Sequence, residues 1–61
     1  MKTAFERNDY KFEPQPIIYF NGRLTRPWHV FFKHKGALGN YFWVRLGTRF
    51  YSPRTPKRDI I

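Results

Sequence analysis

Every second residue in two short segments is aromatic or basic: Phe31, Lys33 and Lys35 in residues 31–35, and Tyr41, Trp43 and Arg45 in residues 41–45. In an extended strand, alternate side chains share a face. Each segment can therefore place rings and cations together on one side of a sheet. An exposed ring stacks on an unpaired base with a gain of about 1–3 kcal/mol, and neighbouring cations neutralise phosphates. The pattern is typical of proteins that bind single-stranded nucleic acid.

The distribution of charge also favours an anionic partner. From Pro14 to Arg58 the chain has nine basic side chains and no acidic one, and the formal net charge of the 61 residues is +8. Soluble surfaces normally mix both signs, which limits self-repulsion. Nucleic acid, an acidic protein surface or anionic lipid would each compensate this charge.

The elements that must position these residues are predicted to be strands and turns. Asn21-Gly22 is a strong type I′ hairpin sequence, because both central residues need positive φ. Pro27 predicts a corner or an edge position. Residues 36–40 form a predicted loop, and Gly47-Thr48 a predicted type II′ turn into a last strand. We therefore expect a mostly β domain, a four- to five-stranded antiparallel meander that is either a curled sheet or a small open barrel.

The ends of the chain are predicted to differ from this sheet. Residues 1–13 form an N-terminal arm or a short helical turn over Thr3–Asp9, in which Thr3 and Glu6 would make a capping box. Residues 14–53 form the β-meander, and residues 54–61 form an extended basic tail after Pro53 and Pro56.

Period-two alternation divides the side chains into a core face and a binding face. The core face is predicted to be Trp28, Val30, Phe32 and His34 with Phe42, Val44 and Leu46, joined by Leu24 and part of residues 17–20. The other face holds His29, Phe31, Lys33, Lys35, Tyr41, Trp43 and Arg45. An alternative stays open for this second face, since Phe5, Tyr10 and Phe12, or another copy of the chain, could cover it.

Catalysis, cofactors and metals are not expected. The chain has no cysteine, which excludes disulfides and thiolate metal sites. Ser52 is the only serine, and the two histidines and four scattered acids do not form a catalytic motif. No apolar run approaches a membrane span, and the N-terminal residues lack the apolar stretch of a secretory signal. We expect a non-enzymatic, cytoplasmic protein without a cofactor.

The leading hypothesis is a small basic protein that stacks single-stranded or structured RNA or DNA on the mixed face, with low sequence specificity. An inhibitor or adaptor that docks on an acidic protein surface is the alternative, since Trp, Tyr and Arg are enriched at interface hot spots. A subunit of a larger nucleoprotein particle, or a homo-oligomer, is also compatible. The candidate binding residues are Phe31, Lys33, Lys35, Tyr41, Trp43, Arg45, Arg49, Arg54, Lys57 and Arg58.

Overall fold

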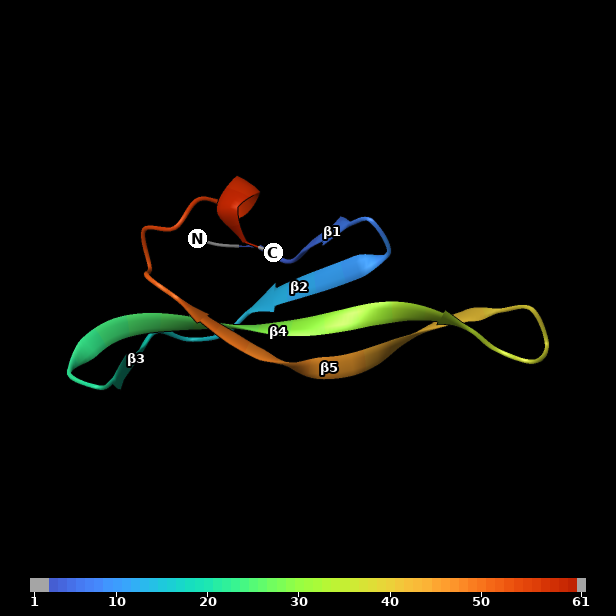
Figure 1. The fold of residues 1–61 in the computed structure, drawn as a ribbon, viewed down its shortest axis with the longest axis horizontal. Coiled ribbons are helices and arrows are strands. Elements are labelled where there is room, and N and C mark those ends of the chain that lie inside the picture. Colours follow the sequence, from blue (N-terminus) through green and yellow to red (C-terminus); the bar gives the residue numbers. More distant parts are fainter. Residues whose placement is uncertain (1–2, 61) are drawn as a thin grey trace.

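The structure, a computed structural model, describes residues 3–60 and shows one open antiparallel sheet of five strands (Figure 1). The predicted fold class is confirmed, and the sheet is open rather than closed into a barrel. Among the described residues, no helix is long and apolar enough to cross a membrane. The elements are β1 (Phe5–Arg7), β2 (Tyr10–Pro14), β3 (Ile18–Phe20), β4 (Arg23–Lys35), β5 (Tyr41–Tyr51) and a 3-10 turn, η1 (Lys57–Asp59).

The long strand β4 is the centre of the sheet. β5 pairs with β4 along one edge, over Arg26–Lys35. β2 and β3 follow one another along the other edge, because β2 ends where Pro14 pairs with Trp28 and β3 begins where Ile18 pairs with Thr25. The predicted hairpin between β3 and β4 is confirmed, with φ of 52° at Asn21 and 75° at Gly22.

Pro27 lies inside β4, where the sequence predicted a corner or an edge. Its carbonyl accepts a 2.8 Å hydrogen bond from the Gln15 N–H. A non-proline residue here would return a bond to the Gln15 carbonyl, which proline cannot do. The guanidinium of Arg26 takes that role instead, with Nη1 donating to the Gln15 carbonyl at 2.9 Å. The strand continues through Pro27 because a neighbouring side chain replaces the missing donor.

β5 is continuous through Gly47 and Thr48, so the predicted turn there is wrong. The register shifts between the pairs Val30–Gly47 and Phe31–Arg45, which leaves Leu46 as an extra residue in a β-bulge. A bulge accommodates one additional residue without ending the pairing. The 13 residues of β4 offer partners along all of β5, so the glycine bends the strand rather than reversing it.

The N-terminal residues form a β-hairpin instead of a helical turn. Asn8 and Asp9 join β1 to β2 with φ of 51° and 68°, a left-handed conformation that Asn and Asp tolerate better than most residues. The hairpin brings the Phe5 and Phe12 rings into a stack with centroids 5.0 Å apart, and the Phe5 and Trp28 rings form a T-shaped pair with centroids 5.6 Å apart. Burial of these rings against β4 explains why the hairpin is preferred.

The core lies on the face of the sheet that carries Trp28. It consists of Phe12, Trp28, Val30 and Ile60, and Ile60 is fully buried. The C-terminal segment turns back over this face after β5 (Figure 1). Residues 54–60 therefore do not form the extended basic tail that was predicted, because the Ile60 side chain packs in the core with Phe12, Trp28 and Val30.

Much of the predicted core face stays uncovered. The C-terminal segment reaches only the half of the sheet near Trp28, so Phe32, Phe42 and Val44 are exposed, and Leu46 is 58% exposed. The molecule is elongated, measuring 46 × 20 × 17 Å, with a radius of gyration of 13.2 Å. A compact 61-residue domain would have about 10.5 Å. Large surfaces on both faces are therefore open.

Candidate nucleic-acid interface

One face of the sheet gathers six of the predicted binding residues. Residues that pair across antiparallel strands project to the same side. The pairs Phe31–Arg45, Lys33–Trp43 and Lys35–Tyr41 therefore share one face, and β2 adds Lys11 opposite Phe31. The basic-aromatic face is defined as Lys11, Phe31, Lys33, Lys35, Tyr41, Trp43 and Arg45.

Two lysines lie above the rings of this face. The Lys11 Nζ is 4.9 Å from the ring centroid of Phe31 and 5.0 Å from that of Trp43. The Lys33 Nζ is 5.5 Å from the Tyr41 centroid and 5.6 Å from that of Trp43. All four distances are within the range of about 6 Å over which a cation is attracted to a ring face. Trp43 is thus shared by both ammonium groups.

No other described segment covers this face. The N-terminal hairpin, which could have packed over it, lies beside β4 in the sheet and directs Phe5 and Phe12 to the opposite face, against Trp28. Tyr41 is 61% exposed, and Phe31 and Trp43 are half-buried. The side chains of Lys11 and Lys33, which lie above these rings, account for part of this burial.

A polar contact holds Arg45 beside the bulge. The Arg45 Nη2 donates to the Thr48 Oγ1 at 3.1 Å, and the same hydroxyl lies 2.9 Å from the Nδ1 of His29. His29 pairs with Thr48 in the sheet, so all three side chains share the basic-aromatic face. A guanidinium has five N–H donors. The bond to Thr48 orients Arg45 and uses one of these donors.

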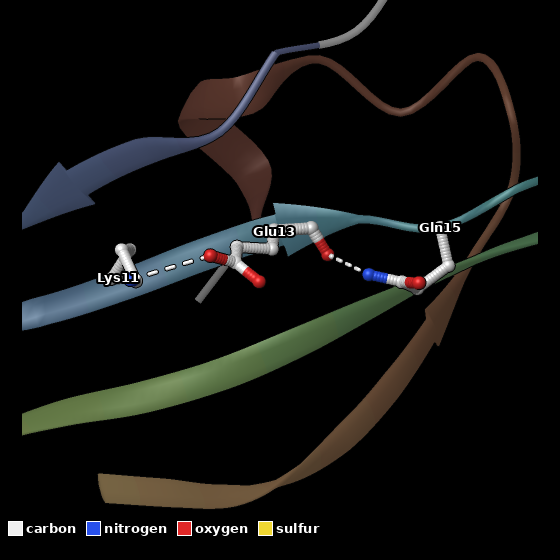
Figure 2. Close-up of polar contacts among 3 residues, drawn as sticks. All are labelled: Lys11, Glu13 and Gln15. Atoms are coloured by element: carbon white, nitrogen blue, oxygen red, sulfur yellow. Dashed lines mark hydrogen bonds and ion pairs between the residues drawn. The ribbon is translucent and has the colours of Figure 1, made fainter. Parts of the chain in front are cut away.

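Lys11 is a candidate that the sequence analysis missed, because it lies in the charge-balanced N-terminal arm. Its Nζ is 3.3 Å from the Oε2 of Glu13, whose backbone carbonyl accepts a bond from the Gln15 side-chain amide (Figure 2). Glu13 pairs with His29, so the pairing of β2 with β4 brings one acid to the margin of the face. The sequence feature that could have predicted the position of Lys11 is Asn8-Asp9, because Asn and Asp adopt the positive φ of a hairpin turn.

The remaining predicted residues lie elsewhere. Arg49 pairs with Trp28 and therefore projects to the core face. Arg54 and Arg58 are exposed on the C-terminal segment that covers that face. The Lys57 Nζ donates to the Thr3 Oγ1 at 2.8 Å. These four residues are not brought together with the basic-aromatic face.

A second ring pair lies at the β3 end of the same face. The Phe20 and Phe50 rings are parallel to within 7°, with centroids 4.9 Å apart. Phe20 pairs with Arg23 and Phe50 with Pro27, so Thr25 lies between them on β4 and is buried. Sequence reasoning missed this contact because it joins the two outer strands across the central one.

The fold and this face define a small open-sheet β protein with an exposed cluster of aromatic side chains. No protein-family model matches the chain, and neither a curated protein nor a solved structure matches it. Its function is therefore inferred from the chemistry of these residues.

Proposed function

We propose that this chain binds single-stranded or otherwise unpaired nucleic acid on the basic-aromatic face. The supporting observation is that Lys11 and Lys33 place their ammonium groups 4.9–5.6 Å above the rings of Phe31, Tyr41 and Trp43, on a face without a covering segment. Bases would stack on the rings while the lysines neutralise phosphates.

The lysines must move aside for a base to stack, and the energies permit this. An exposed cation–π contact contributes about 0.5–1 kcal/mol, whereas a stacked base contributes about 1–3 kcal/mol. The partly exposed ion pair between Lys11 and Glu13 contributes about 0–1 kcal/mol. Each lysine contacts two rings, so the contacts that it gives up are of the same size as the gain from one stacked base. The phosphate that the ammonium group then neutralises favours the bound arrangement.

The composition of the face favours low sequence specificity. Base edges are read mainly by bidentate groups such as Asn, Gln and Arg. Arg45 is the one such group among the residues of the basic-aromatic face, and the rest are rings and lysines. Stacking tolerates every base, so affinity would depend on strandedness and charge more than on sequence.

A salt titration with a labelled oligothymidine of roughly 12 nucleotides tests this function. Each phosphate neutralised on a single strand contributes about −0.7 to the slope of log K against log salt concentration. Lys33→Gln with Lys35→Gln should therefore make the slope shallower by about 1.4. Absence of binding near 50 mM salt would overturn the proposal.

A double variant on the other side of the sheet is the matched control. Arg54→Gln with Arg58→Gln removes the same formal charge from two exposed residues of the C-terminal segment. Its slope should stay close to that of the unmodified chain. If both double variants make the slope shallower by the same amount, the binding is not directed by the basic-aromatic face.

A further inference from the structure

The sheet is notched where β5 ends before β4 does. The last pair of these strands is Arg26–Tyr51, while β4 extends on to Arg23 and the hairpin turn. A cavity of about 590 Å³ lies there, which is within the usual size range of small-molecule sites. The hairpin notch is defined by six of its lining residues, Phe20, Arg23, Leu24, Thr25, Phe50 and Ser52; Asn21 and Tyr51 complete the lining.

The backbone of Leu24 supplies a hydrogen-bond donor and an acceptor to this notch. The Pro27 carbonyl bonds to Gln15 on the β2 side, and backbone groups of successive residues point to opposite edges of a strand. The Leu24 N–H and carbonyl therefore point to the β5 side. If the pairing of β4 with β5 continued past Arg26–Tyr51, Pro53 would stand opposite Leu24. Proline has no N–H to donate to the Leu24 carbonyl.

The stacked rings form an aromatic wall of the same notch. Phe20 and Phe50 are 45% and 48% exposed, so each keeps accessible ring surface although the two stack on each other. Thr25 is buried, and Arg23 belongs to the lining. The notch thus combines a π-surface, an adjacent backbone donor–acceptor pair and a cation.

A nucleobase with its phosphate matches these groups. Its ring stacks on phenylalanine, its Watson–Crick edge carries adjacent donors and acceptors, and arginine binds phosphate. On β4, Leu24 in the notch and Phe31 at the centre of the basic-aromatic face are seven residues apart, or about 23 Å. A strand of a few nucleotides could reach both.

We infer that the hairpin notch holds one unpaired base of the strand that crosses the basic-aromatic face. This inference rests on the proposed function and extends it, because the backbone of Leu24 would contact a base edge directly. The notch would then be the point at which the otherwise unspecific face discriminates among bases.

A nitrogen-15 NMR titration with unlabelled oligothymidine tests the inference on the intact chain. We expect shifts of both the Leu24 amide and the Trp43 indole signals. A shift of Trp43 without any change at Leu24 would refute the notch while leaving the proposed function in place. If neither signal shifts, both the proposed function and the notch are wrong.

Two phenylalanines on opposite faces of β5 provide matched variants. Phe42 and Phe50 are both 48% exposed, but Phe42 pairs with His34 on the core face. Phe50→Leu should weaken oligonucleotide binding about tenfold, and Phe42→Leu should leave it unchanged. Arg23→Gln probes the notch without touching the ring stack and should also weaken binding. Equal affinities for the Phe50, Phe42 and Arg23 variants would contradict the inference.

Discussion

Arg7 fastens the C-terminal segment to the N-terminal hairpin through Ile60, 53 positions further along the chain. The Arg7 Nη1 donates to the Ile60 carbonyl at 2.8 Å, and its Nη2 donates to the Lys57 carbonyl at 2.7 Å. The Lys57 carbonyl, at the start of η1, also accepts the Ile60 N–H at 3.1 Å, and the Ile60 carbonyl lies just past the end of η1. One guanidinium therefore holds the segment whose last described side chain completes the core.

Arg7→Gln should destabilise the fold by about 1–3 kcal/mol, because two charge-assisted hydrogen bonds are lost. The urea midpoint should fall while the slope of the unfolding transition is retained. Arg58→Gln removes the same charge from an exposed position on the same segment and should shift the midpoint little. Equal midpoints for the two variants would show that the bonds of Arg7 do not hold the segment.

Ile60→Val should cost about 0.5–1.5 kcal/mol, since it removes one methylene from a fully buried side chain. Valine is preferred to alanine, because a 61-residue chain has only roughly 3–9 kcal/mol of total stability. Ile17→Val, at a side chain that is 43% exposed, is the control and should be nearly neutral by thermal unfolding. A neutral Ile60→Val would mean that the C-terminal segment does not cover the core.

The two tryptophans should differ in access to quenchers. Trp28 is 1% exposed, while Trp43 is half-buried beside the ammonium groups of Lys11 and Lys33. Iodide should quench Trp43 more strongly than caesium at equal concentration, because the local charge attracts anions. In the Trp43→Phe variant the remaining emission should resist both ions. Strong quenching in that variant would indicate that the core is open.

Gly22→Ala should destabilise the β3–β4 hairpin by about 1–2 kcal/mol, because its φ of +75° is unfavourable for residues with a Cβ. Nothing lies within 4 Å of an added Cβ, so the cost is conformational rather than steric contact. Gly22→Asn should cost less, since Asn adopts this conformation more readily. Thermal unfolding of both variants measures the difference, and equal losses would argue against a left-handed residue at this turn.

Local chemistry and period-two alternation were sufficient to predict part of this protein from sequence. Asn21-Gly22 needs positive φ whatever surrounds it, so the hairpin was predictable. The same alternation placed Phe31 and Lys33 on one side and Trp28 on the other, as the structure shows. The antiparallel fold class followed from these strands and turns.

Contacts between distant segments were decided only by the tertiary structure. Ile60 is buried in the core and Lys11 lies over Trp43 because of how the two ends of the chain pack on the sheet. No local sequence pattern predicts these contacts. The bulge at Leu46 arises because β4 continues past the glycine that suggested a turn. Strand propensity and alternation are local properties. Which segment covers a face of the sheet, and which face stays exposed, depends on the apolar surface that the whole chain can bury.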